Sequence, residues 1–342
     1  MRRILAAALA ALTLVPAASA AGTRRKTSDP DAALYAAARR EGSLVWYAIP
    51  LPYNKTVIAQ FEKRYPGVTV TPLYAGGTQL IQRFKLEKAA GKEIDDCLSS
   101  GLTEAYPELR RQGWLAPLSG LPHWKQRPAW AKDPHGAYFY YANFRVVLMW
   151  NTDLVKPGTE PKSVAELIQP RWRGRVVMFD PTSAGVAVPL YRWVVQKLGL
   201  GFPWLKALRA NGVLLANDAA QLDETVASGR RAVTLTRDTE AFGALQRGAP
   251  IAFRVPEEGS MLHLMPIAIN ARAPHPNAAR LFVDWLLSDE GRAALASQKV
   301  GLPEDGEAVF KRSKAWALDA ETVSPTETKS FVDSAVAALK GG

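Results

Sequence analysis

Cysteine and histidine are scarce in this chain of 342 residues, and their scarcity excludes several kinds of site. Cys97 is the single cysteine, so neither an intramolecular disulfide nor a cysteine-based metal cluster can form. It stands in "EIDDCLSS", a predicted strand, where we expect a small buried apolar side chain rather than a catalytic thiol. The histidines are His123, His135, His263 and His275, and they lack the spacing of metal ligands. We therefore predict no metal and no cofactor.

Signature motifs of common enzymes are also missing. The chain contains no G-x-S-x-G, no H-E-x-x-H and no G-x-x-x-x-G-K-[ST] pattern. The sequence therefore favours a binding protein, and an enzyme is the alternative of another class.

A long apolar run occurs only at the start of the chain, and it is too short to span a bilayer. Met1, Arg2 and Arg3 form a basic start, an apolar run of about 12 residues follows, and small residues end it at Ala20. This layout predicts a secretory signal peptide (1–20) cleaved after Ala20, and hence a soluble periplasmic protein.

Basic residues exceed acidic ones, with a formal charge of +11 that falls to +9 without Arg2 and Arg3. The basic residues are dispersed between acidic ones, in runs no longer than "RRK" and "RWRGR". We interpret them as a solvated surface that attracts anionic solutes, and we expect no nucleic-acid partner.

Strand-like and helix-like patterns alternate along the chain in two series. The first series has strands at 43–49, 67–74 and 94–98 and helices at 53–65, 76–91 and 103–113. An aromatic strand follows at 138–151, and the second series then has strands at 176–179, 213–216 and 232–236, each followed by helical patterns. Repeated alternation predicts parallel sheets covered on both faces, and two series joined by one extended strand predict two α/β lobes.

A strongly periodic helix is expected near the C-terminus. In "PNAARLFVDWLLSDEG" the apolar residues recur at the i, i+3, i+4, i+7 and i+8 positions of one helix face. Asn277 is the expected N-cap of this helix.

Four loops at predicted strand ends are small, polar or rich in glycine. Ligands collect at the carboxyl ends of strands in open α/β sheets, and the N-termini of the helices that follow favour negative charge. Each loop alone could be an ordinary turn, but four at equivalent strand ends predict one shared cleft. They are Ala48 to Tyr53, Gly76-Gly77-Thr78, Ser99-Ser100-Gly101 and Thr182-Ser183-Ala184-Gly185.

Several stretches together resemble a known family. They follow one another in order as "LVWYAIPLPYNKTVIAQFEKRYPGVTVTPLYAGG", "RVVLMWNTDLV", "WRGRVVMFDPTSAG", "PEEGSM" and "INARAPHPNAARLFVDWLLSDEGRAAL". The chain resembles a periplasmic extracellular solute-binding protein of an ABC importer, in the group of ferric-ion, phosphonate and sugar-phosphate binding proteins. The resemblance covers nearly the whole chain after the signal peptide.

This resemblance implies a type II-like periplasmic-binding-protein fold, with two open mixed sheets joined by crossover strands and closing on a ligand by a hinge. The implied first lobe is 21–142 with 263–305, the second lobe is 143–262, and the C-terminal helices at 306–342 pack on the second lobe. The implied partners are a small anionic solute and the membrane permease subunits of an ABC importer. We expect a monomer, and a sensor subunit that presents its ligand to a membrane receptor is a further alternative.

The resemblance also suggests which charged residues bind the solute. It places an anion-contacting arginine at Arg145, for which a surface or interlobe salt bridge is the other interpretation. Arg237 and Asp238 end the strand at 232–236 and could face the cleft. Tyr53 could form a wall of the pocket or belong to the core. The predicted ligand-binding residues are thus Tyr53, Gly76, Gly77, Thr78, Ser99, Ser100, Arg145, Thr182, Ser183, Gly185, Arg237 and Asp238.

Iron is the alternative ligand that this resemblance suggests. Ferric members of the family present an adjacent tyrosine pair from the second lobe, but the matching segment here reads "LTRDTEAFGALQRG" and contains no tyrosine. Tyr140 and Tyr141 are adjacent on a predicted strand, so their rings should point to opposite faces. We therefore expect no tyrosinate–iron chelate.

Overall fold

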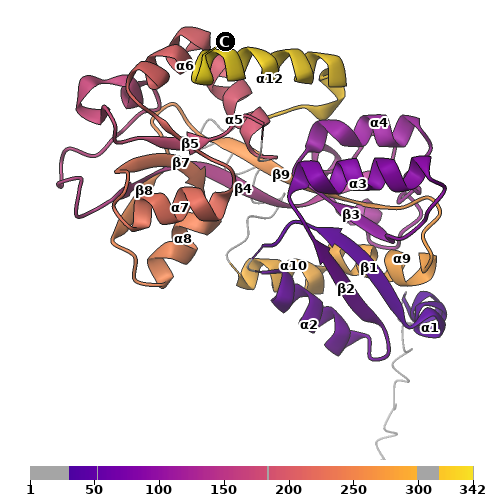
Figure 1. Ribbon diagram of the computed structural model, residues 1–342. Helices are drawn as coiled ribbons and strands as arrows, with labels where there is room; N and C mark the ends of the chain where they lie inside the picture. The colour runs from indigo at the N-terminus through magenta and orange to yellow at the C-terminus, as the bar shows by residue number, and fades with distance from the viewer. Residues whose placement is uncertain (1–30, 52, 183–184, 299–315, 342) are drawn as a thin grey trace, which may run out of the picture.

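The computed structural model describes residues 31–51, 53–182, 185–298 and 316–341. It consists of two lobes of strands and helices with long strands passing between them (Figure 1). This is the two-lobed α/β fold that the sequence predicts. The predicted signal peptide lies outside the described residues.

The first lobe is built on three parallel strands. β1 (Ser43–Ala48) lies between β2 (Thr69–Tyr74) and β3 (Cys97–Ser99). β9 (Met261–Ile269) comes from much later in the chain and pairs antiparallel with β3. The helices of this lobe are α1 (Ala32–Glu41), α2 (Asn54–Arg64), α3 (Gly77–Ala89), α4 (Tyr106–Arg111), α9 (Pro276–Leu287) and α10 (Asp289–Ser297).

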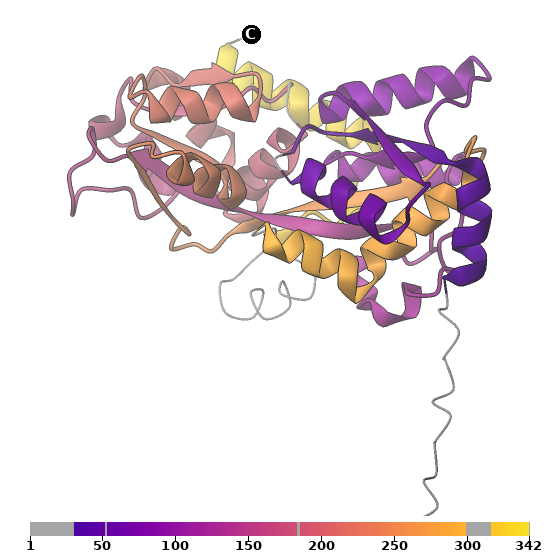
Figure 2. The same cartoon turned by 90° about the horizontal axis from the view of Figure 1, so that it is seen from below.

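Helices cover both faces of this sheet. α3 and α4 lie on one face, where Leu80, Phe84 and Tyr106 are buried in a single hydrophobic cluster. α1, α2, α9 and α10 lie on the other face, around a second cluster that contains Phe61 and Trp285. Figure 1 shows the two groups above and below the strands, and Figure 2 views the molecule from the side of α2 and α10. Burial on both faces explains why the strands of this lobe are rich in apolar residues.

One strand connects the two lobes along its length. β4 (Tyr138–Asn151) pairs with β9 in its first half, and with β7 (Val233–Arg237) and β8 (Ile251–Arg254) in its second half. The aromatic run at 138–151 therefore forms the long strand that its sequence predicts. Such a strand is a continuous mechanical link between the lobes.

The second lobe adds a short pair of parallel strands. β5 (Val177–Phe179) pairs with β6 (Leu214–Ala216), and an isolated parallel bridge from Val176 to Val233 joins this pair to β7. The helices of this lobe are α5 (Ala187–Arg192) with a π-helical continuation (Trp193–Lys197), α6 (Gly201–Ala210), α7 (Ala219–Ala227) and α8 (Asp238–Gln246).

The C-terminal segment contacts both lobes. It contains β10 (Trp316–Ala317), a 3-10 turn (Ala320–Thr322) and α12 (Pro325–Lys340). Glu321 in the turn forms an ion pair with Arg110 of α4, at 3.0 Å. Phe331 and Ala335 of α12 are buried in the hydrophobic cluster of the second lobe, and Lys340 forms an ion pair with Asp180 at 2.6 Å. Figure 1 shows α12 next to α6.

The start of α9 corrects one sequence prediction. The helix begins at Pro276, so Asn277 lies inside its first turn and is not the N-cap. The backbone N–H groups of Asn277 and Ala278 donate to the carboxylate of Glu41, at 3.2 and 2.7 Å. A carboxylate at the end of α1 therefore caps α9, as the helix dipole favours. This cap could not be predicted, because Glu41 is far away in the sequence.

Candidate functional site

A cavity of about 750 Å³ lies where the two lobes meet. Loops that follow β1, β2 and β3 line it from the first lobe, and the ends of β5, β6 and β7 with their loops line it from the second. These are the carboxyl ends of the strands, where open α/β sheets bind ligands. The polar residues in the lining are Thr78, Gln79, Gln82, Thr182, Asn217, Asp218, Arg237 and His263.

The N-terminus of α3 faces this cavity. Gly76, Gly77 and Thr78 line it, and backbone N–H groups in the first turn of a helix have no acceptor within the helix. A Cβ atom added to Gly77 would lie 2.9 Å from Oγ of Ser100, so the close approach of these two loops favours glycine. The first lobe therefore offers backbone donors and the positive end of a helix dipole to a ligand.

At the N-terminus of α3 the Gln79 side chain accepts the backbone N–H of Gly76 at 3.2 Å. At the N-terminus of α7 a second side chain is also engaged. Asp218 accepts the backbone N–H of Gln221 at 2.8 Å, and the Gln221 side chain accepts the backbone N–H of Asn217 at 2.7 Å. Asp218 also adds a negative charge to the lining. The part of the cavity next to the N-terminus of α7 therefore suits hydroxyl or amine groups of a ligand better than acidic ones.

Arg237 supplies the positive side chain of the lining. Its side chain is 8% exposed, and its guanidinium forms an ion pair with Glu240 and lies 5.2 Å from the centroid of the Phe144 ring. Nε of Arg237 is buried and has no hydrogen-bond partner in the described part of the chain. Because a guanidinium keeps its charge and has several donors, Arg237 can bind an anion while it remains paired with Glu240.

His263 lines the cavity from β9. Its Nε2 lies 3.0 Å from the carbonyl oxygen of Gly101, while its Nδ1 has no hydrogen-bond partner among the residues that the structure describes. Burial, followed by the charge of Arg237, lowers the pKa of His263 to about 3. The imidazole is therefore neutral at physiological pH.

Six of the twelve predicted ligand-binding residues line the cavity, and five of the others do not. The lining members are Gly76, Gly77, Thr78, Thr182, Gly185 and Arg237. Thr182 is held in place by Asp180, which accepts its backbone N–H at 2.9 Å and its hydroxyl at 2.7 Å. Ser183 lies outside the described residues.

Three of the predicted residues form hydrogen bonds within the first lobe and are absent from the lining. The hydroxyls of Tyr53 and Ser99 both bond to the hydroxyl of Tyr141, at 3.2 and 3.1 Å. The hydroxyl of Ser100 donates to the carbonyl of Gly77 at 3.0 Å and accepts the backbone N–H of Leu102 at 3.2 Å. These bonds fix the loops that shape the cavity, and a direct contact of these side chains with a ligand stays a prediction.

Arg145 and Asp238 bind each other instead of lining the cavity. Nε of Arg145 donates to Asp238 at 2.9 Å, and the backbone N–H of Arg145 donates to the other carboxylate oxygen at 3.1 Å. The salt-bridge interpretation of Arg145 therefore describes the structure. Asp238 begins α8, so the pair fixes the start of that helix to β4.

Sequence reasoning missed several residues of the lining. Asn217 and Asp218 follow β6, and the strand-end rule would have found them had it been applied to that strand. Gln79 and Gln82 lie one and two turns into α3, where only the orientation of the helix decides whether they reach the cavity. His263 stands inside a strand and carries no sequence signal.

A second cavity of about 630 Å³ adjoins the first and shares Thr78, Gln82 and Thr182 with it. Glu104 lines this second cavity and is 5% exposed. Burial raises the pKa of Glu104 to about 7, although the charge of Arg192 acts in the opposite direction. A buried carboxyl with a raised pKa makes the folded state sensitive to pH.

We expect the Glu104→Gln variant to become more stable relative to the unmodified protein as the pH rises from 5 to 8. The folded-state pKa lies above the unfolded value, so the stability due to the protonated carboxyl is present at acidic pH and is lost as the pH rises through about 7. Glutamine has no proton to lose. The difference in unfolding free energy should grow by about 3 kcal/mol over this range, since one pKa unit corresponds to about 1.4 kcal/mol.

Urea unfolding at several pH values measures this difference. Glu108→Gln is the control, because Glu108 is partly exposed and paired with Lys85 at 2.9 Å, and its replacement should change stability by less than about 1 kcal/mol. Parallel pH profiles of the Glu104→Gln variant and the unmodified protein would contradict the prediction.

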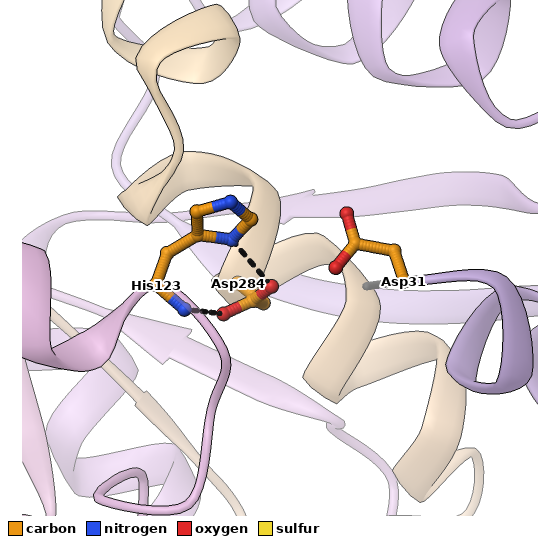
Figure 3. Close-up of side chains that lie close together, drawn as sticks. All are labelled: Asp31, His123 and Asp284. Carbon is orange, nitrogen blue, oxygen red and sulfur yellow. Dashed lines mark hydrogen bonds and ion pairs between the residues drawn. The ribbon is translucent and has the colours of Figure 1, made fainter. Parts of the chain in front are cut away.

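Asp31, His123 and Asp284 form a cluster in the first lobe, away from the lining of either cavity (Figure 3). Each offers one possible metal-ligating atom, and these atoms lie within 4.8 Å of one another. The carboxylate of Asp284 already accepts the backbone N–H of His123 at 2.9 Å and contacts its Nδ1 at 2.8 Å. These contacts attach the loop at His123 to α9. The three residues are far apart in sequence, so spacing could not reveal the cluster.

The described ranges contain no helix that is long and apolar enough to cross a membrane.

An uncharacterized protein of Haemophilus influenzae is 33% identical to this chain over 147 residues. This match spans 42% of each chain, less than half the length of that relative. A probable ABC transporter periplasmic-binding protein of Sinorhizobium fredii is 26% identical over 275 residues, which cover 77% of this chain and 75% of the relative.

Solved structures share the fold. The substrate-binding protein of an ABC transporter from Agrobacterium tumefaciens has a TM-score of 0.80 at 18% identity, covering 87% of this chain and 94% of its own. AfuA of Actinobacillus pleuropneumoniae, solved with fructose-6-phosphate, has a TM-score of 0.72 at 20% identity, and the match covers 88% of this chain and 100% of AfuA. Iron-bound HitA of Pseudomonas aeruginosa has a TM-score of 0.67 at 19% identity, and the match covers 87% of this chain and 97% of HitA. At these identities the likeness concerns the fold alone.

The family comparison covers most of the chain. The model of the family described as bacterial extracellular solute-binding protein matches residues 51–298, which include both sides of the cavity. The resemblance indicated by the sequence is thereby confirmed. The chain belongs to the family of bacterial extracellular solute-binding proteins.

Proposed function

We propose that this protein is the periplasmic receptor of an ABC importer and that it captures a small anionic organic solute in the cavity between its lobes. The observation that carries the proposal is the pairing of two anion-binding groups across that cavity. Gly77 and Thr78 of the first turn of α3 line it from one lobe, and Arg237 lines it from the other. Phosphate, phosphonate and carboxylate groups fit such a pair of donors.

Two named similarities support this class of ligand and partner. The Sinorhizobium fredii relative is named as a probable periplasmic-binding protein of an ABC transporter. AfuA was solved with a sugar phosphate. We propose the same kind of membrane partner, the permease subunits of an importer, and a periplasmic location after removal of residues 1–20.

Closure of the lobes on the solute is part of the proposal. We place the lobes at 21–142 with 263–305 and at 143–262, and within the C-terminal segment 306–342 we assign α12 to the second lobe. β4 and β9 cross between these parts, so a small change in their bend would open or close the cavity. We propose that the protein acts as a monomer and carries out no catalytic step.

Iron is the second candidate ligand, because HitA was solved with bound iron. The lining of the cavity contains one carboxylate, Asp218, one histidine, His263, and no tyrosine among the described residues. Tyr140 and Tyr141 are buried in different hydrophobic clusters, and burial raises the pKa of each. A ferric ion requires several convergent anionic ligands, so this lining supports an organic anion better.

Thermal unfolding of the purified protein with a panel of solutes tests the proposed function. We expect a phosphate, phosphonate or carboxylate compound to stabilise it by about 2.7 kcal/mol at 100 times its dissociation constant. Uncharged sugars should have no such effect. Ferric citrate is the contrasting arm, and a coloured complex that survives gel filtration would favour iron. Stabilisation by neutral solutes alone would contradict an anion receptor.

A further inference from the structure

Two buried polar atoms at the cavity have no partner among the residues that the structure describes. They are Nε of Arg237 and Nδ1 of His263. Both residues line the cavity, and they are 7% and 2% exposed. Nearly all buried polar groups in folded proteins form hydrogen bonds, because an unmatched one costs free energy. Because both atoms belong to residues that line one cavity, we infer that a bound molecule matches both.

The pairing of three strands brings these atoms to one place. Val146 of β4 pairs with Arg237 of β7, and Phe144 of β4 pairs with His263 of β9. Residues 144 and 146 share a face of β4, so Arg237 and His263 lie on the same face of the sheet. Both contact the Phe144 ring, with the guanidinium carbon 5.2 Å and the imidazole centroid 6.3 Å from its centre.

The hydrogen bond of His263 determines which of its nitrogens carries the proton. The carbonyl of Gly101 can only accept, so Nε2 at 3.0 Å from it must be the N–H. Nδ1 is then an unprotonated acceptor, because the ring is neutral. Burial, followed by the charge of Arg237, lowers the pKa of the ring and keeps it so. Gly101 permits this contact, since a Cβ atom there would lie 2.4 Å from Nε2 of His263.

Arg237 and His263 therefore make complementary demands on a ligand. Nε–H of Arg237 requires an acceptor, which an anionic oxygen provides best. Nδ1 of His263 requires a donor, which a carboxylate or a fully ionised phosphate lacks. A simple anion satisfies only the first of these two groups.

We propose that the cavity selects a hydroxylated anion, whose acidic group contacts Arg237 and whose hydroxyl donates to Nδ1 of His263. This inference rests on the proposed anion-binding function and narrows its substrate class to hydroxy acids and phosphorylated polyols or sugars. His263 is the residue that determines this specificity.

Matched pairs of probes test the selection by calorimetry on the purified protein. Glycerol 3-phosphate is compared with propyl phosphate, and lactate with propionate, because the members of each pair differ chiefly in hydroxyl groups. We expect the hydroxylated member of at least one pair to bind about tenfold or more tightly, as for a buried acceptor that would otherwise stay unmatched. For lactate and propionate the ratio should be the same at pH 5.5 and pH 7.5, because His263 stays neutral and both carboxylates stay mainly ionised over that range.

Two variants of His263 assign the preference to Nδ1. In His263→Gln the amide can still donate to Gly101 from the position of Nε2 but offers no acceptor at Nδ1, so the ratio should fall to about one to two. In His263→Asn the amide oxygen lies near the position of Nδ1, so much of the ratio should remain. Nitrogen-15 NMR of histidine-labelled protein, which needs no variant, should show a protonated Nε2 and an Nδ1 signal that shifts when the hydroxylated probe binds.

The possible failures are distinguishable. If no anionic compound binds, neither these probes nor those of the thermal panel, the proposed function fails and this inference fails with it. If both members bind equally, the anion receptor stands and the hydroxyl selection is wrong. An unchanged ratio in the His263→Gln variant, or a protonated Nδ1 in the NMR spectrum, would overturn the role of His263.

Discussion

Replacing Arg237 with methionine should weaken the binding of an anionic solute by about 10- to 100-fold. The reason is the loss of the charged hydrogen bond from the guanidinium, and such a bond contributes about 1.5–3 kcal/mol. Titration calorimetry with the solute found in the thermal panel measures the change. Methionine is unbranched and apolar, so it can keep the contact with Phe144, which lies 5.2 Å from the guanidinium carbon.

The same substitution should also destabilise the fold by about 3 kcal/mol, because Glu240 loses its ion-pair partner in a buried environment. Thr239 still donates to Glu240 at 2.7 Å, so we expect the lower part of the range for broken buried pairs. The double variant Arg237→Met, Glu240→Gln removes both charges and should recover most of the stability without recovering the binding. Unchanged affinity in this double variant would remove Arg237 from the site.

Replacing Trp285 with alanine should destabilise the protein by about 3–5 kcal/mol, which is the usual cost of removing a large buried aromatic side chain. Trp285 is 1% exposed on α9. Its ring lies 5.6 Å from that of Phe61 and 6.5 Å from that of Phe282, so its loss opens a hole between α2 and α9. The midpoint of urea unfolding measures the effect.

Two controls separate packing from other effects of this substitution. Trp285→Phe keeps an aromatic ring and removes an indole N–H that has no hydrogen-bond partner in the described ranges, so it should cost only about 1–2 kcal/mol. Leu86→Ala removes an apolar side chain from a residue that is 70% exposed and should change stability by less than about 0.5 kcal/mol. Equal losses for Trp285→Ala and Leu86→Ala would contradict the packing argument.

The sequence alone determined the alternation of strands and helices over much of the chain and the edge of the sheets where the cavity lies. The strand at 138–151 has the predicted bounds. Its aromatic and β-branched residues favour a strand, and its continuous apolar character fits a strand that is covered on both faces. The convergence of the loops at Gly77 and Thr182 on one cavity was also predictable. It follows from a general property of parallel strands, whose carboxyl ends meet at one edge of the sheet.

Only the tertiary structure decided which side chains meet at that edge. Arg145 lies on the predicted long strand, but its guanidinium pairs with Asp238, which is 93 residues away in the sequence. His263 faces the cavity because β9 pairs with β4 in a register that sets it opposite Phe144, and a shift of one residue would turn it to the other face. Local patterns fix φ, ψ and the buried face of an element, whereas the partner of a polar side chain depends on strand register and on loops from distant parts of the chain. No pattern within a single segment contains that information.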